Sequence, residues 1–127
     1  MEKRIYYHDT DAGGVVYYGR YLNYLEEART EFLDNRGLSV KGFHDQGFLY
    51  AVRKCTIIYK SPARYGDFIV CDAELKEITA AQIVFNQTIK EKKSGRLMVE
   101  AEISLVCLNK DFKPTQIPED LKRKLKK

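Results

Sequence analysis

Two aspartates and two glycines near the N-terminus are the residues best suited to chemistry. Asp9 and Asp11 precede Gly13 and Gly14, and an aromatic stretch leads from them into a predicted helix. This order places a carboxylate beside the free N–H groups of a helix N-terminus, with permissive backbone between them. Such N–H groups polarise carbonyls, and Asp11 could act on the carbonyl or on a nearby water. Tyr18, next to the helix start, could offer its N–H to the carbonyl and its ring to a pocket.

The same residues have a structural interpretation, which stays open. Aspartates ahead of glycines commonly form Asx turns or helix caps, and glycines commonly serve in turns. A calcium loop fits less well: Asp9, Asp11 and Gly14 match its first, third and sixth positions, but Arg20 stands where a bidentate glutamate is needed. A sugar-nucleotide D-x-D site would need a βαβ pattern, which the chain lacks.

A long amphipathic helix follows this candidate loop, which covers residues 8–19. It begins near Arg20 and ends at Gly37, a good C-terminal stop. Its apolar stripe recurs at helical spacing and consists of Tyr21, Leu25, Ala28 and Phe32. We expect Glu26, Glu27 and Glu31 on the helix surface, where one of them could supply a second carboxylate across an interface.

Strands account for most of the remaining chain. Residues 2–7 predict a first strand, residues 39–46 a short helix or loop, and Pro118 the start of a last short helix. Four longer segments are rich in β-branched residues or alternate in polarity: 49–59, 68–78, 82–91 and 97–108. Their short connections favour antiparallel pairing. We therefore predict one α+β domain over residues 1–127, with a long antiparallel sheet wrapped around a single long helix.

The charge of the chain argues only weakly for a polyanionic partner. The net charge is +4, and part of the excess lies in Lys122–Lys127, which we interpret as a solvated terminal helix or tail. We expect no nucleic-acid partner. No apolar run reaches the length of a membrane span and no secretory leader opens the chain, so we expect a cytoplasmic protein.

Several other chemistries find no support in the sequence. Cys55, Cys71 and Cys107 each lie in apolar runs and form no C-x-x-C pair, which predicts buried reduced thiols and no metal site. His8 and His44 are isolated, and His44 is expected in solvent. The chain has no nucleophile elbow, phosphate loop, zinc-protease motif or dinucleotide fingerprint.

Three segments resemble a known family. Residues 7–17 read YHDTDAGGVVY and closely resemble the signature of the hotdog-fold thioesterases of the 4-hydroxybenzoyl-CoA type, in particular the YbgC-like acyl-CoA thioesterases. Residues 26–31 (EEARTE) resemble the family's central helix, and residues 59–67 (YKSPARYGD) its inter-strand segment. The resemblance covers nearly the whole chain up to about residue 110.

This resemblance implies hydrolysis of acyl-CoA thioesters with Asp11 as nucleophile or as general base for water. It implies that the N–H near Tyr18 polarises the thioester carbonyl, with Gly14 and Val16 among the substrate-binding residues. Arg64 is the expected contact for coenzyme A, which is part of the substrate; no metal or further cofactor is expected. It also implies dimers whose sheets join edge to edge, often paired into tetramers, with active sites between subunits.

The chain departs from the family pattern at two positions. Many YbgC-like members carry His where this chain has Tyr18, although the 4-hydroxybenzoyl-CoA enzyme has tyrosine there. His8 replaces a residue that is usually Glu in the YbgC-like group. Two other functions are kept as alternatives: hydrolysis of acyl groups on acyl carrier protein, and a non-catalytic acyl-binding hotdog protein. The acyl chain length is not fixed by the sequence.

Overall fold

The four long strands form where the polarity pattern predicted them. The computed structural model describes residues 1–127. Its long strands are β2 (Leu49–Tyr59), β3 (Phe68–Ile78), β4 (Gln82–Glu91) and β5 (Leu97–Leu108). With the short β1 (Glu2–Arg4) they form one antiparallel sheet in the order β1-β3-β4-β5-β2. This arrangement confirms the predicted α+β hotdog class.

The first strand is shorter than predicted. Beyond Arg4 the expectation of a strand to residue 7 is wrong, because a short 3₁₀ helix, η1, occupies Tyr7–Asp9. The N–H of Tyr6 donates to the Asp9 carboxylate at 2.9 Å. A side chain thus replaces the neighbouring strand as hydrogen-bond acceptor, which ends the ladder and turns the chain toward the loop.

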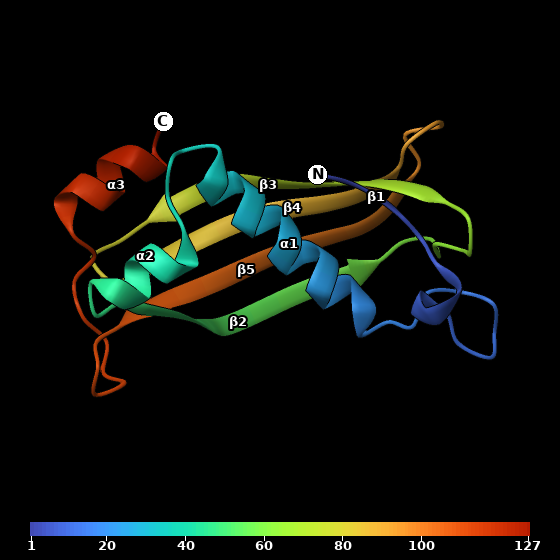
Figure 1. Ribbon diagram of the computed structural model, residues 1–127. Coiled ribbons are helices and arrows are strands. Elements are labelled where there is room, and N and C mark those ends of the chain that lie inside the picture. Colours follow the sequence, from blue (N-terminus) through green and yellow to red (C-terminus); the bar gives the residue numbers. More distant parts are fainter.

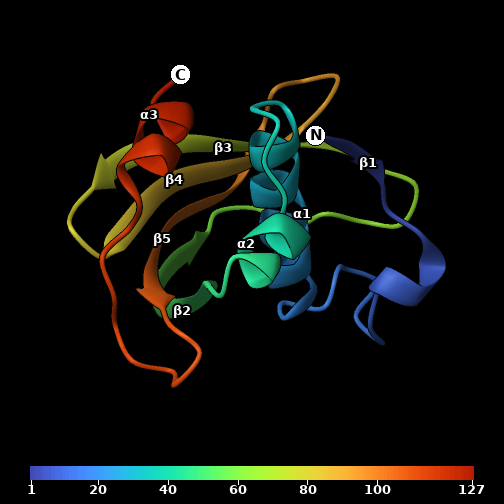
Figure 2. The same ribbon diagram turned by 60° about the vertical axis from the view of Figure 1, so that its left-hand side comes forward.

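Helix α1 (Arg20–Asp34) lies across the concave face of the sheet. Figure 2 shows the strands curving around this helix. The predicted apolar stripe is buried as expected, and Tyr24 is buried beside it. Tyr21, Leu25 and Ala28 join residues from the sheet and the N-terminal segment in the larger of two hydrophobic clusters, whereas Phe32 belongs to the second.

Two short helices complete the cover of the sheet, at the places where the sequence predicted a short helix or loop (39–46) and a last short helix (from Pro118). A helix of fifteen residues is about 22 Å long, whereas an eleven-residue strand spans about 36 Å. Helices α2 (Val40–Asp45) and α3 (Glu119–Leu125) lie at the end of the sheet opposite the candidate loop (Figure 1). Leu121 and Leu125 of α3 are buried in the second cluster. None of the helices is long and apolar enough to span a membrane.

The predicted burial of the cysteines holds for two of the three. Cys71 and Cys107 are buried, and desolvation raises the pKa of the Cys71 thiol to about 12. Cys55 is exposed, so the expectation for it was wrong. Cys55 lies on β2, one of the two edge strands of the sheet, where a side chain has a neighbouring strand on one side only. All three thiols are free.

Candidate active site

A tight turn displays the segment that contains Asp11. Thr10 and Val16 form an isolated antiparallel bridge, and the N–H of Asp11 donates to the carbonyl of Val15 at 2.9 Å. Gly14 closes the turn with φ of 78°, a conformation that side chains with a Cβ disfavour. Val16 anchors the turn: its side chain is buried, and its N–H donates to the Ala63 carbonyl at 2.8 Å.

The two oxygens of the Asp11 carboxylate differ: one holds the turn by a hydrogen bond, and the other has no partner in the chain. Its Oδ1 accepts the N–H of Gly13 at 2.8 Å, which is the Asx turn allowed for by the sequence. Its Oδ2 has no hydrogen-bond partner within the chain, and the residue is exposed. A Cβ on Gly13 would stand 3.1 Å from Oδ1, so the glycine permits this position of the carboxylate.

Unpaired donors lie at the start of α1, shortly after the turn. The N–H groups of Tyr18 and Gly19 donate to no acceptor in the chain, as is usual ahead of a first helical turn. The first turn of α1 carries no acidic side chain. The N–H groups of Tyr18 and Gly19 are therefore free for a ligand carbonyl. Around them, the Tyr59 hydroxyl donates to the Tyr18 carbonyl at 3.4 Å, and the Tyr17 and Tyr18 rings lie 4.8 Å apart.

The second aspartate of the motif has a different environment. Asp9 is 3% exposed, and the phenol of buried Tyr24 lies near its carboxylate. Burial first, and then Asp9, raises the pKa of Tyr24. The exposed His8 places its Nε2 3.6 Å from Asp9 Oδ1, beyond hydrogen-bond distance. Asp9 thus stabilises the loop from within, whereas Asp11 lies exposed on its surface.

Arg64 is brought beside the turn by an isolated bridge with Val15. Its backbone N–H donates to the Asp67 carboxylate at 2.9 Å, which fixes the local turn. Its guanidinium takes part in no salt bridge, and the residue is exposed. The structure therefore brings together the turn, the helix start and a free cation.

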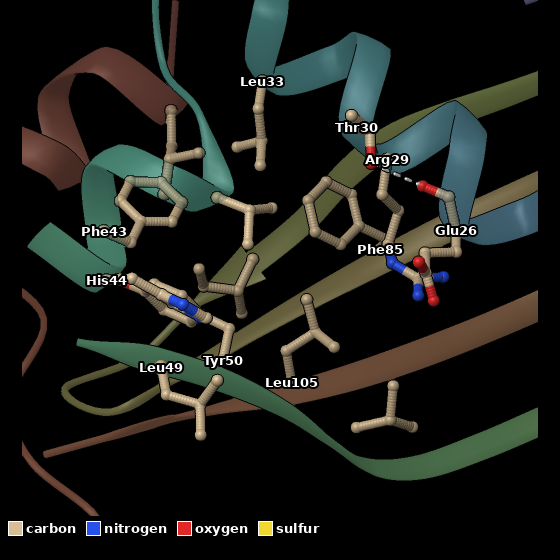
Figure 3. Close-up of a pocket in the computed structure, with 14 residues that line it drawn as sticks. Glu26, Arg29, Thr30, Leu33, Phe43, His44, Leu49, Tyr50, Phe85 and Leu105 are labelled. Atoms are coloured by element: carbon tan, nitrogen blue, oxygen red, sulfur yellow. Dashed lines mark hydrogen bonds between the residues drawn. The ribbon is translucent and has the colours of Figure 1, made fainter. Parts of the chain in front are cut away.

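A separate pocket of about 240 Å³ lies beside the other half of α1 (Figure 3). No residue of the candidate loop around Asp11 (residues 8–19, the Asp11 loop) lines it. Its walls come from α1, α2, α3, β2, β4 and β5. Ten of its fourteen lining residues are hydrophobic, including Phe43, Leu49 and Phe85. Its ionisable lining includes Glu26 and Arg29 of α1 and His44 of α2.

Sequence reasoning missed a polar pair in this region. The Nη1 of Arg29 donates to Oε1 of Gln87 at 2.9 Å, and Nε2 of Gln87 donates to the Leu25 carbonyl at 2.9 Å. Gln87 is 2% exposed. One signal was present: Gln87 occupies the same alternating face of its strand as Ile83, Phe85 and Ile89, where a polar side chain needs a partner.

A curved antiparallel sheet around a central helix, with an acidic turn beside the helix start, defines a hotdog-fold protein with a candidate acyl-transfer site. Comparison with known proteins agrees. Residues 6–125 match the family model described as the thioesterase-like superfamily, and the chain belongs to this family. The protein described as acyl-CoA thioester hydrolase YbgC from Escherichia coli is 36% identical over 119 residues, which cover 93% of this chain and 88% of the relative.

Two solved structures show the same architecture. A hypothetical protein from Thermus thermophilus is 28% identical with a TM-score of 0.92, covering 99% of this chain and 95% of its own. A mutant of 4-hydroxybenzoyl-CoA thioesterase, in complex with 4-hydroxybenzoyl-CoA, has a TM-score of 0.90 at 20% identity. The match covers 98% of this chain and 96% of that structure's chain. At that identity the second likeness concerns the fold alone.

Proposed function

We propose that this protein hydrolyses acyl-CoA thioesters to the free acid and coenzyme A, with Asp11 as the catalytic carboxylate. The supporting observation is the unpartnered Oδ2 of Asp11 close in the chain to the free N–H groups that precede α1. The N–H of Tyr18 would polarise the thioester carbonyl and stabilise the oxyanion. The 36% identity with a relative described as an acyl-CoA thioester hydrolase supports the substrate class.

The remaining residues have supporting roles in this proposal. Asp11 acts as nucleophile or as general base for water, and the thiolate leaves with little need of protonation. Gly14 lets the backbone approach the substrate, and Val16 holds the turn in place. The free guanidinium of Arg64 would bind a phosphate group of coenzyme A. No metal or additional cofactor enters the scheme.

We further propose that the working unit is a dimer joined along β2, with each active site between two subunits. β2 has eleven residues, and β5 pairs with only one of its two edges. A long strand with an unpaired edge is a template for pairing with another chain. The concave side of its exposed part carries apolar side chains such as Val52 and Tyr59. Sedimentation analysis should give at least a dimer, and a monomer at all concentrations would contradict this assembly.

The decisive experiment compares the wild-type protein with Asp11→Asn on a panel of short, long and aromatic acyl-CoA thioesters, measured by release of free thiol. The variant keeps an acceptor for the Gly13 N–H but is a poor nucleophile and base, so kcat should fall by about 10³-fold or more. Asp111→Asn, an exposed aspartate in the turn after β5, is the matched control and should keep full activity. Equal turnover by Asp11→Asn would disprove the assignment of Asp11.

The carrier-protein alternative is distinguished by the same panel. Turnover of acyl groups on acyl carrier protein, without turnover of acyl-CoA, would favour it, and the net charge of +4 suits an acidic partner. A folded protein that binds acyl-CoA and hydrolyses neither substrate would instead be an acyl-binding hotdog protein. The cytoplasmic location stays a prediction.

A further inference from the structure

The pocket beside α1 contains a cation that the chain leaves partly unsatisfied. Arg29 donates one hydrogen bond, to Gln87, and no carboxylate oxygen lies within 4.0 Å of its guanidinium. A guanidinium has five N–H donors and keeps its charge in proteins. Arg29 is half-buried, and this partial burial lowers its pKa. Its remaining donors are therefore available to an acceptor on a ligand.

The polar neighbours in the pocket do not supply that acceptor. Glu26 lies on the same helix and its charge acts on Arg29, but it is exposed and beyond ion-pair distance. The Thr30 hydroxyl donates to the Glu26 backbone carbonyl at 3.1 Å (Figure 3). The Tyr50 hydroxyl is buried in the pocket wall without a hydrogen-bond partner. The pocket is thus apolar along most of its walls but has unmet polar groups.

The position of Arg29 is fixed before any ligand arrives. Gln87 accepts from Arg29 and is itself tied to the Leu25 carbonyl of the same helix. Figure 3 shows Arg29 of α1 and Phe85 of β4 among the residues that line the pocket. A guanidinium held in this way can recognise an oxygen without first losing the conformational freedom of a surface arginine.

The proposed dimer brings this pocket to the reacting carbonyl. Within one chain the two lie at opposite ends of β2: Leu49 lines the pocket, and Tyr59 contacts Tyr18. Fully overlapped antiparallel pairing of two β2 strands sets Leu49 of one copy opposite Tyr59 of the other. The pocket of the second copy then adjoins the helix start and Asp11 loop of the first.

We propose that this pocket holds the distal part of the acyl group, and that Arg29 makes it selective for acyl groups ending in a hydrogen-bond-accepting oxygen, best of all a carboxylate. This inference rests on the proposed hydrolysis and on the β2 dimer. An alkyl terminus would leave the guanidinium desolvated and without a partner, which disfavours binding. An oxygen at the same place completes its hydrogen bonds.

The test uses coenzyme A thioesters matched in length and differing only at the distal end: plain alkyl, ω-hydroxy and ω-carboxy acyl groups of four to eight carbons. The wild-type protein should show kcat/KM at least about tenfold higher for an oxygen-bearing thioester than for its alkyl counterpart at one or more lengths. Equal or better turnover of the alkyl thioester at every length would overturn the inference while leaving thioester hydrolysis intact. Turnover of none of them would instead count against the proposed function.

Variants then assign the preference to one side chain. Arg29→Met removes the charge at similar length and should bring the oxygen-to-alkyl ratio of kcat/KM close to one. Arg123→Met, at an exposed arginine of α3 outside the pocket, is the matched control and should keep the wild-type ratio. Because Arg29→Met also leaves Gln87 short of a partner, the folding of the variant is checked first. If the variant does not fold, the oxygen-to-alkyl ratio of the wild-type protein is the test. An unchanged ratio in a folded Arg29→Met protein would overturn the role of Arg29.

Discussion

At the scale of single residues, two aspartates only two positions apart have opposite environments. The Asp9 carboxylate is buried and accepts the Tyr6 N–H, whereas Asp11 is exposed and keeps one oxygen free. The difference comes from the turn that follows η1, not from residue type. Gly13 takes part directly, because its missing Cβ leaves room for Asp11 Oδ1.

Substitution of Gly13 by alanine should lower catalysis with little effect on folding. The added Cβ would stand 3.1 Å from Asp11 Oδ1, so the carboxylate has to move, and small displacements of a reacting group are costly. We expect kcat to fall about tenfold or more while the free energy of unfolding changes by less than ~0.5 kcal/mol. Gly42→Ala is the matched control, because a Cβ at Gly42 would also stand 3.1 Å from a side-chain oxygen, that of Ser39. Equal kcat in both variants would contradict the role of Gly13.

At the scale of elements, local pattern was sufficient for most of the fold. The predicted bounds of all four long strands are those observed, because alternation over ten or more residues is a strong signal. The errors concern tertiary contacts. The end of β1 depends on the Tyr6–Asp9 hydrogen bond, and the exposure of Cys55 depends on which strand lies at the edge. Neither is encoded in local periodicity.

The candidate site was predictable to a similar depth. The acidic turn and the helix start adjoin in sequence, so their proximity follows from local structure. The pair of Arg29 and Gln87 joins residues 58 positions apart, on α1 and β4, and needs the packed fold to become visible. The pocket that this pair adjoins was for the same reason absent from the sequence-based prediction.

Replacing Gln87 by leucine should destabilise the contact between α1 and β4. The variant loses a hydrogen bond to a charged group and one to the Leu25 carbonyl, and leaves Arg29 with no partner in the chain. We expect the free energy of unfolding to fall by about 2–3 kcal/mol, measured by urea denaturation. Gln82→Leu, on the same strand but without a side-chain hydrogen bond, should change it by less than ~0.5 kcal/mol. Similar losses in the two variants would show that the pair adds nothing to stability.

At the scale of the whole molecule, two hydrophobic clusters follow each other along the sheet. The larger one lies under the first part of α1 and the other under α2 and α3. Buried phenols belong to both: Tyr21 and Tyr24 are in the first, and Tyr50 packs against the second. Desolvation is the first cause of the raised pKa of each of them.

These phenols make the fold sensitive to alkaline pH. A folded pKa above the ordinary value of 10.0 means that stability is fully present below about pH 10 and is lost as the pH rises further toward the folded pKa. The free energy of unfolding should therefore decline from about pH 10 upward, as measured to about pH 11.5. Tyr24→Phe should show a shallower decline, because it removes one buried phenol. An identical decline in the variant would rule out a contribution from Tyr24.

The distribution of aromatic residues gives the molecule an intrinsic optical reporter. The chain has nine tyrosines and no tryptophan, and those with exposed rings surround the Asp11 loop and helix start: Tyr6, Tyr7, Tyr17, Tyr18, Tyr59 and Tyr65. Tyr50 alone lies at the far end of the sheet, among the pocket residues. Native tyrosine emission thus originates mostly at one end of the molecule. A nucleotide-bearing ligand that settles there should quench this emission, so that its affinity is measurable on the unlabelled, unmodified protein.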